Sequence, residues 1–380
     1  MKRLFISAAI VATLAGCTQQ PGVTFALTGL EADDSVKVMF NNLSDYTRQS
    51  VSDTFAIPGG TLFIPNESDT PMVYSIYKMP RRFPDGSMEA MSMHGIYLPV
   101  LPGAAIKVEG DFKDYRVSGN TPFYKELATL EAQIKPLRKD AFAAAVASYD
   151  KKRPQSERDS LVAIVKECES RISAVVNEFI DANSDSDAAL YAFYHYADIE
   201  KDYANLQKIS ERVCKGTFAS YYDNIVAQYN KMQKSREAEK RVADGMIAPD
   251  FTLKNIDGKN VTLSSLRGKY IVLDFWGSWC GWCIKGIPEM KKMYGKYKKQ
   301  LEVVGIACGD TEEVWKKCVA QNNLPWTNLL NGEGENNVPD NYAIKGYPTK
   351  IILDKEGRIL RTVIGESPEF YTFIDSLMTR

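Results

Sequence analysis

Two cysteines lie three positions apart in the segment 276–283, WGSWCGWC, directly after the apolar run of residues 270–275. The chain has seven cysteines in 380 residues, and no other two are so close together. A disulfide that closes such a short loop adds little stability through chain entropy. We therefore expect Cys280 and Cys283 to react with other thiols and disulfides rather than to brace the fold.

The position of this pair at the end of a strand gives a physical reason for reactivity. A helix is expected to begin at Cys280 and to run through residue 297. The first turn of a helix has unpaired N–H groups and a positive dipole end, so a thiolate at Cys280 would be stabilised and its pKa lowered. Cys283, one turn further on, is expected to be buried and less acidic. One cysteine would attack and the other would resolve.

The stretch 274–283, DFWGSWCGWC, resembles the active site of the thioredoxin superfamily. Flanking motifs sharpen the likeness to its TlpA/ResA-like branch of membrane-tethered thiol–disulfide oxidoreductases: APDF at 248–251, LSSLRGK at 263–269 and GYPT at 346–349. The resemblance covers residues 246–380. It implies a thioredoxin-like α/β fold and the reduction of protein disulfides through a mixed disulfide, with no cofactor.

The resemblance also assigns roles to residues. The nucleophile falls on Cys280, the resolving thiol on Cys283, the redox disulfide on this pair and the cis-proline on Pro348. A cis-proline would turn the neighbouring backbone toward Cys280, where a substrate strand can pair with it. Trp282 departs from the Gly-Pro of thioredoxin, which leaves the reduction potential open. The expected substrate-binding residues are Trp279, Gly281, Trp282, Tyr347 and Thr349, although packing alone would also account for Trp276 and Trp279.

Asp274 is a carboxylate in an otherwise apolar strand, six residues before Cys280. Burial raises the pKa of a carboxyl group, and such a group could take the proton from Cys283 as that thiol attacks the mixed disulfide. Many TlpA/ResA-like proteins instead keep a Glu three residues after the second Cys, where this chain has Gly286. We therefore expect Asp274 to handle the proton. The alternative is an Asp at the sheet edge that is bound to a nearby Lys.

Other reactive residues give weaker indications. Cys308 and Cys318 read as small apolar residues, with a regulatory third thiol as the alternative. Cys168 and Cys214 read as buried thiols, although an extracytoplasmic location would permit a disulfide between them.

The segment 88–94, MEAMSMH, could supply the soft ligands of a copper(I) site. The alternative interpretation of this segment is ordinary apolar packing. No metal site is predicted, because the Cys280–Cys283 pair has no second ligand pair nearby. A thiol peroxidase is disfavoured, because Gly277 and Leu273 stand where that class needs a Thr or Ser and a Pro.

The first residues read as a lipoprotein signal. A basic start at Lys2 and Arg3 precedes an apolar stretch and the sequence Leu14-Ala15-Gly16-Cys17, which resembles the bacterial lipobox. Lipidation of Cys17 would anchor the protein to a membrane of the bacterial cell envelope, facing the periplasm. Residues 18–22 would form the rest of a short tether.

The pattern of apolar, polar and turn-forming residues changes along the chain, which indicates several domains. The expected arrangement is a signal peptide at 1–16, a tether at 17–22, an antiparallel β-sandwich-like domain at 23–120, a helical region at 121–245 and the thioredoxin-like domain at 246–380. The β region resembles the N-terminal domains of Bacteroidetes lipoproteins. Short alternating runs separated by Gly, Pro and Asn suggest the strands, and Thr121-Pro122 suggests a helix start.

Composition sets further bounds. The net charge is −1, which gives no field that would attract nucleic acid. No nucleotide-binding glycine motif is present, so reducing equivalents would come from a membrane electron donor. Two alternatives stay open: a binding or scaffold lipoprotein in which the thioredoxin domain is secondary, and a disulfide oxidase or isomerase. The client protein, the oligomeric state and the role of residues 23–244 are not encoded in any motif.

Overall fold

A computed structural model describes residues 20–43, 51–90, 94–332 and 337–379. The described residues form two compact units, and the division between Tyr229 and Asn230 falls inside helix α6 (Ala219–Arg241). None of the described helices combines the length and the apolar character that a membrane span requires.

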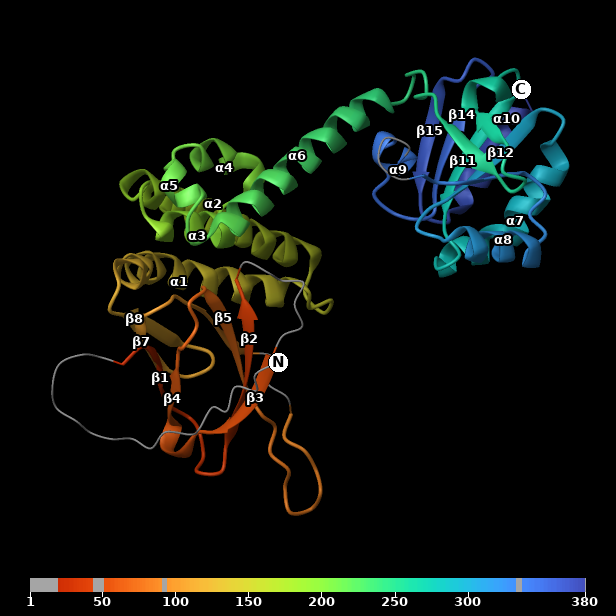
Figure 1. Cartoon of the computed structure of the whole chain (residues 1–380). Coiled ribbons are helices and arrows are strands. Elements are labelled where there is room, and N and C mark those ends of the chain that lie inside the picture. The colour runs from red at the N-terminus through yellow and green to blue at the C-terminus, as the bar shows by residue number, and fades with distance from the viewer. Residues whose placement is uncertain (1–19, 44–50, 91–93, 333–336, 380) are drawn as a thin grey trace. The chain divides into compact units, whose positions relative to one another are not determined.

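Eight strands of the first unit form two four-stranded sheets (Figure 1). One sheet has the order β4-β1-β7-β8 and the other β3-β2-β5-β6. Strand β1 pairs with β7 in parallel, whereas the remaining pairs are antiparallel. The prediction of an antiparallel β domain is therefore wrong for this one pair of strands. The strands are β1 (Gly22–Leu27), β2 (Ser35–Asn42), β3 (Val51–Ala56), β4 (Thr61–Pro65), β5 (Met72–Lys78), β6 (Gly95–Val100), β7 (Ala105–Gly110) and β8 (Tyr115–Gly119).

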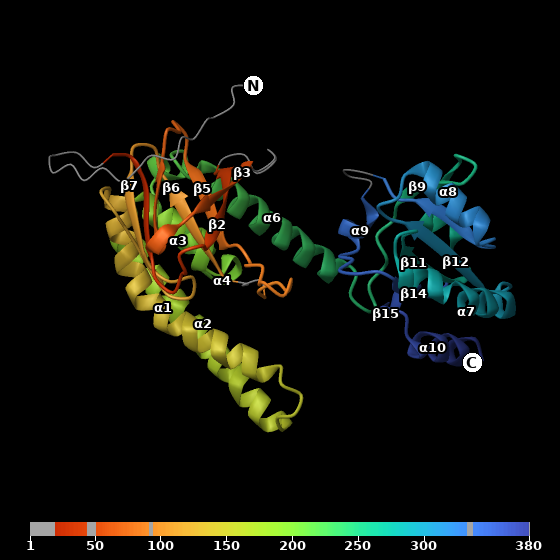
Figure 2. The same ribbon diagram turned by 90° about the horizontal axis from the view of Figure 1, so that it is seen from below.

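Helices complete the first unit. Figure 1 shows α1 between the strands and the other helices, and Figure 2 shows α1 and α2 side by side as a long hairpin. Helix α1 begins at Pro122 after Thr121, as predicted, although the Thr121 side chain makes no capping hydrogen bond. One apolar core joins strands and helices. The helices are α1 (Pro122–Ser148), α2 (Gln155–Ala182), α3 (Asp187–Tyr196), α4 (Ile199–Leu206), α5 (Glu211–Cys214) and α6.

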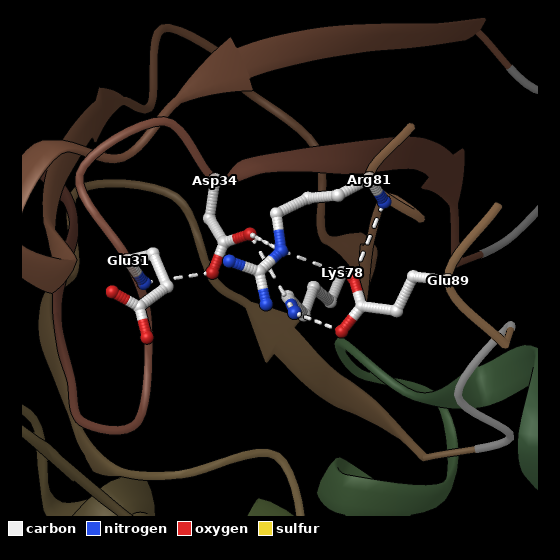
Figure 3. Close-up of polar contacts among 5 residues, drawn as sticks. All are labelled: Glu31, Asp34, Lys78, Arg81 and Glu89. Atoms are coloured by element: carbon white, nitrogen blue, oxygen red, sulfur yellow. Dashed lines mark hydrogen bonds and ion pairs between the residues drawn. The ribbon is translucent and has the colours of Figure 1, made fainter. Parts of the chain in front are cut away.

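An ion network around one buried carboxylate links the residue before β2 to the end of β5 (Figure 3). The side chain of Asp34 is fully buried and lies 3.5 Å from Lys78 Nζ and 3.4 Å from Arg81 Nε. Glu89 contacts the same two cations, at 2.8 Å and 3.4 Å, and Asp34 also accepts the backbone N–H of Glu31 at 2.8 Å. Two carboxylates thus share two cations, and the segment that carries Glu89 is held against strand β5.

The second unit is a seven-stranded mixed sheet with the order β10-β9-β13-β12-β11-β14-β15. Strand β11 lies near the middle, parallel to β12 and antiparallel to β14. Val272 on one face of β11 packs with Met290 of α7 and Phe370 of α10, and residues of the other face form a separate core. The elements are β9 (Thr252–Asn255), β10 (Asn260–Thr262), β11 (Tyr270–Trp276), α7 (Gly281–Tyr297), β12 (Leu301–Ala307), α8 (Glu312–Gln321), β13 (Thr327–Leu330), α9 (Val338–Asn341), β14 (Thr349–Leu353), β15 (Ile359–Ile364) and α10 (Pro368–Met378).

Most of these elements match the prediction for residues 246–380. The central strand, the helix after the cysteine pair, the final hairpin and the last helix lie where the pattern placed them. The sequence suggested no strand at Thr327–Leu330, because four residues after Pro325-Trp326 show no alternation of their own.

Candidate active site at the start of α7

Cys280 and Cys283 are joined by a disulfide at the N-terminal end of α7, with their Cα atoms 5.2 Å apart. Cys280 is the N-cap residue of this helix, and its Sγ accepts the backbone N–H of Cys283 at 3.2 Å. That interaction would also stabilise a thiolate on Cys280 once the disulfide is reduced. Both residues pack against Trp276 and Trp315. The described geometry is the oxidised form of the predicted pair.

The loop between β11 and α7 is anchored to the chain that follows β12. Ser278 donates its backbone N–H and its hydroxyl to the carboxylate of Asp310. The indole N–H of Trp279 donates to the carbonyl oxygen of Cys308 at 2.9 Å. Gly277 leaves the space for this indole, since a Cβ there would lie 2.5 Å from Trp279 Nε1. Two side chains thus fix the loop that presents Cys280.

Large aromatic side chains surround the disulfide at the surface. Trp279 is 58% exposed and packs edge-to-face on Tyr347, with ring centroids 5.3 Å apart. Trp282 is 64% exposed, and Lys285 Nζ lies 4.8 Å from its ring centroid. Gly281 has no neighbouring atom within 4 Å of where a Cβ would be. Of the five predicted substrate-binding residues, these tryptophans and Gly281 are open to an approaching molecule.

The peptide bond between Tyr347 and Pro348 is cis, as the resemblance implied. Thr349 follows as the first residue of β14, where it is buried and pairs with Phe275 of β11. Its hydroxyl donates to the carbonyl oxygen of Gly346 at 2.7 Å. Thr349 therefore shapes the turn from within, and its side chain is not available to a substrate.

Asp274 is buried in the middle of the sheet, with 9% of the residue exposed. Burial raises its pKa to about 6; the positive charge of Lys350 opposes this shift and the negative charge of Glu366 adds to it. Lys350 lies directly opposite in the β11–β14 ladder, with Nζ 3.9 Å from Asp274 Oδ1. This oxygen has no hydrogen-bond partner among the described residues. Asp274 is therefore not at a sheet edge, although a Lys is its neighbour.

Lys350 and Glu366 belong to this site, and sequence reasoning did not identify either. Lys350 is only 2% exposed and forms its close ion pair, at 2.8 Å, with Glu366 rather than with Asp274. Glu366 also accepts the hydroxyl hydrogen bond of Tyr371 at 2.5 Å. A Lys within the apolar run 349–353 was the available signal for Lys350, whereas nothing local marks Glu366.

The other thiols lie in apolar surroundings. Cys308 and Cys318 are free and buried, and burial raises the pKa of the Cys308 thiol to about 12 and also raises that of Cys318. These shifts make both sulfurs poor nucleophiles at neutral pH. Cys168 and Cys214 are likewise free and buried, so the disulfide considered between them is not present.

Two sequence hypotheses involve residues that the structure does not fully describe. Cys17, the proposed lipidation site, lies outside the described residues. In the segment considered for copper(I), Met91 and Met93 also lie outside them, and Met88 is exposed. Within the described ranges, no group of three or more His, Cys, Asp or Glu side chains is placed to hold a metal ion.

Comparison with known proteins places this site in a family. Residues 245–362 match the model of the AhpC/TSA family. The thiol-disulfide oxidoreductase ResA of a Bacillus cereus strain is 30% identical over 155 residues, which are 40% of this chain and 83% of that protein. ResA of Bacillus subtilis (strain 168) is 30% identical over 142 residues, covering 37% of this chain and 76% of that protein.

Solved structures show similar stretches of sequence. The thioredoxin domain of a thiol-disulfide oxidoreductase from Bacteroides vulgatus is 29% identical, with a TM-score of 0.33, over 36% of this chain and 98% of that one. A thiol:disulfide interchange protein from Bacteroides sp. is 30% identical, with a TM-score of 0.34, over 37% and 93% of the two chains. Through its C-terminal part, which carries the Cys280–Cys283 pair, the chain belongs to the ResA family of thiol–disulfide oxidoreductases.

Proposed function

We propose that this protein is a membrane-anchored, extracytoplasmic oxidoreductase that reduces protein disulfides with the Cys280–Cys283 dithiol. The observation that carries the proposal is the position of Cys280 as N-cap of α7, where its sulfur accepts a helix N–H and is joined to Cys283. Exposed Trp279 and Trp282 beside the pair would offer apolar contact to a protein client.

The first step is attack by the Cys280 thiolate on one sulfur of the client disulfide. The client S–S bond breaks, a mixed disulfide forms between Cys280 and the client, and the second client sulfur leaves as a thiolate that takes a proton from water. The helix N-terminus favours the thiolate form of Cys280 in this step. The cis Tyr347–Pro348 segment would present backbone groups to the client strand.

The second step releases the client. Cys283 loses its proton, and its sulfur attacks the Cys280 sulfur of the mixed disulfide. The Cys280–Cys283 bond forms, the client sulfur leaves, and two electrons have passed from the dithiol to the client. Asp274 is the proposed acceptor of the Cys283 proton, because a buried carboxylate with a pKa of about 6 is a competent base near neutral pH.

The resulting disulfide must be reduced again before another turnover. A dithiol on a membrane protein is the class of donor that fits an extracytoplasmic location, because no nucleotide motif occurs in the sequence. The proposed location rests on the basic and apolar N-terminal residues 1–16 and on Cys17 in a lipobox-like context. Membrane attachment would then depend on acyl chains on Cys17.

Two measurements test the catalytic part. Wild-type protein should reduce insulin in the presence of dithiothreitol well above background, and Cys280→Ser should not. Equilibrium titration against glutathione should give a potential of about −270 mV for a reductase, whereas a value of about −120 mV would make the protein an oxidase. Insulin reduction no faster in wild type than in Cys280→Ser would favour a binding or scaffold lipoprotein.

The anchor is tested separately. Expressed in a bacterial host with the complete lipoprotein pathway, the full chain should fractionate with membranes and its N-terminal peptide should carry acyl mass on Cys17. Cys17→Ala should abolish this modification and release the protein from the membrane fraction. An unmodified Cys17 in a membrane-free wild-type protein would remove this part of the proposal.

A further inference from the structure

Glu366 and Gly286 form an unusual contact close to the cysteine pair. Gly286 lies three residues after Cys283 on α7, which places it on the same face of the helix. A Cβ built on Gly286 would lie 2.4 Å from Glu366 Oε2 and 2.6 Å from its carboxyl carbon. The missing side chain at position 286 therefore leaves room for a carboxylate that arrives from the segment between β15 and α10.

Glu366 is held in this place by two partners. Its Oε2 lies 2.8 Å from Lys350 Nζ, and its Oε1 accepts the Tyr371 hydroxyl at 2.5 Å. It also lines a surface pocket of about 340 Å³, together with Glu289, Ser367, Pro368 and Tyr371. The carboxylate thus lies between a buried ammonium group and a surface pocket.

Lys350 stands between two carboxylates at unequal distances. Its Nζ is 2.8 Å from Glu366 and 3.9 Å from Asp274, and the lysine itself is buried. We propose that Glu366 is a positioning residue for the dithiol site, which acts by drawing the ammonium group of Lys350 away from Asp274. This inference rests on the proposed role of Asp274 as the base that accepts the Cys283 proton.

Electrostatics gives the direction of the effect. A cation in close contact would stabilise the Asp274 carboxylate and lower its pKa, whereas the negative charge of Glu366 raises it. Both the charge of Glu366 and its hold on Lys350 therefore keep Asp274 a stronger base. Two further titratable groups interact with Asp274: the Tyr371 hydroxyl of α10 and the Cys308 thiol after β12. The carboxylate of Glu289 on α7 acts in turn on Tyr371.

The test is a carboxyl titration of Asp274 by ¹³C NMR in the full chain. Glu366→Gln should lower the pKa of Asp274 by about one unit or more, because one negative charge is lost and Lys350 is left with a single carboxylate. Lys350→Met should shift the pKa in the opposite direction. Gly286→Ala should act like Glu366→Gln, because its methyl group displaces the Glu366 carboxylate. Glu369→Gln, at an exposed glutamate of the helix that follows, is the matched control and should change nothing.

Kinetics provides a second readout. In Glu366→Gln, the acidic limb of the pH profile for client release should move to lower pH together with the pKa of Asp274, and release at pH 7 should slow several-fold. An unchanged Asp274 titration in both Glu366→Gln and Gly286→Ala would overturn the inference. If wild type fails to reduce insulin, the proposed function fails, while the titration still decides whether Glu366 tunes Asp274.

A second inference comes from different atoms beside the same strand. Three buried polar atoms converge on Gly305 of β12: a Cβ built there would lie 3.0 Å from Trp326 Nε1, 3.2 Å from Trp276 Nε1 and 3.4 Å from Asn328 Oδ1. None of the three has a hydrogen-bond partner among the described residues, and all three side chains are buried. Asn328 is fixed in this orientation because its Nδ2 donates to the carbonyl of Trp326 at 2.6 Å.

Two N–H donors and one carbonyl acceptor around a single point match the hydrogen-bonding capacity of one water molecule. Burying such groups unpaired would be costly, and polar cavities with two to four partners are where internal waters bind. We infer that Gly305 provides the floor of an internal water site. Gly305 pairs directly with Asp274 in the β11–β12 ladder. A water bonded to both indoles and to Asn328 would have one O–H left, and Asp274 Oδ1 is a buried oxygen that has no hydrogen-bond partner in the described part of the chain.

This site is tested by NMR and crystallography of the full chain. The indole N–H signals of Trp276 and Trp326 should show cross-relaxation with a long-lived water, and a crystal structure at high resolution should show one density peak bonded to both indoles and to Asn328. Gly305→Ala should remove both the cross-relaxation with water and the density peak. The exposed indole of Trp282 is the control and should show only rapidly exchanging solvent. Absence of the peak and of the cross-relaxation in wild type would refute the site.

Discussion

The carboxylate of Asp310 accepts two hydrogen bonds from Ser278, one from its backbone N–H and one from its hydroxyl. Ser278 lies in the loop between β11 and α7, two residues before Cys280. The loop has only one other side-chain anchor described here, the Trp279 indole on the Cys308 carbonyl. The Asp310–Ser278 contact therefore helps to determine where Cys280 is presented.

Asp310→Ala should loosen this loop. Removal of the Asp310 carboxylate leaves the backbone N–H of Ser278 without an acceptor, which should lower the free energy of unfolding by about 1–2 kcal/mol. Insulin reduction should slow several-fold because Cys280 is no longer held in one position. All five tryptophans lie in residues 276–326, so tryptophan fluorescence during urea unfolding reports on the second unit alone. Ser278→Ala removes only the hydroxyl bond and should show a smaller loss; equal losses would contradict the role of the N–H bond.

Replacing Asp274 should change the pH dependence of stability. Its pKa is about 6 in the folded protein and 3.8 in the reference state, so the folded state binds the proton more tightly. The protonated Asp274 carboxyl contributes its full stabilisation of the folded state below about pH 3.8, and this contribution is lost as the pH rises through about 6. Ionisation at pH 7 to 8 thus costs roughly 3 kcal/mol. Asp274→Asn should be more stable than wild type by up to this amount at pH 8, with the gain vanishing near pH 4.

Tryptophan fluorescence against urea at several pH values measures this difference. Lys350 retains Glu366 as a partner in Asp274→Asn, so the variant leaves no unpaired buried cation. The same variant should release a client several-fold more slowly at pH 7. A stability difference that is constant from pH 4 to pH 8 would show that Asp274 does not titrate as inferred.

Asp34 offers a test confined to the first unit. Asp34→Ala leaves Lys78 and Arg81 with Glu89 as their only carboxylate in this network. Asp34 is buried, but its partners in this network are partly exposed, so its loss should lower the stability of this unit by about 1–2 kcal/mol. The loss should appear in the far-ultraviolet circular dichroism transition, whereas the tryptophan transition of the second unit should stay where it is. Asp69→Ala, at an exposed position of the same unit that has no part in the network, is the control. Equal unfolding of Asp34→Ala and wild type would show that the network adds nothing to stability.

Trp282 should affect large substrates more than small ones. Its ring is mostly exposed and contacts Lys285 of its own helix, so Trp282→Ala should leave the unfolding transition nearly unchanged. Loss of apolar contact should lower kcat/KM several-fold for a folded protein client, and leave the rate with glutathione disulfide within about twofold. Equal losses with both substrates would assign Trp282 to tuning the dithiol instead of binding the client.

The C-terminal fold could be predicted because its signals are local. A buried strand, a cysteine pair that opens a helix and a Gly-Tyr-Pro-Thr turn each occupy one short stretch of sequence. The parallel pairing of β1 with β7 joins residues far apart in the chain, and no local pattern encodes strand direction. Strand β13 was missed because its four residues show no alternation.

The same reasoning separates the parts of the candidate site. Cys280, Cys283 and Asp274 follow from spacing and from a charge in an apolar strand. Lys350 and Glu366 meet only because β14 pairs with β11 and the segment before α10 returns over α7. The absence of a side chain at Gly286 was the one local signal of this arrangement. It can be interpreted only together with the Glu366 carboxylate, which comes from a distant part of the sequence.

The burial of Cys168, Cys214, Cys308 and Cys318 limits how many electrons the described part of the chain can store. Because these sulfurs are buried, none of them is open to a client, so under the proposed function one oxidation event uses up the two electrons that the Cys280–Cys283 pair stores. Each released client would therefore need its own visit from a reducing partner. If the proposed function holds, throughput would then follow the supply of that partner more closely than the abundance of clients.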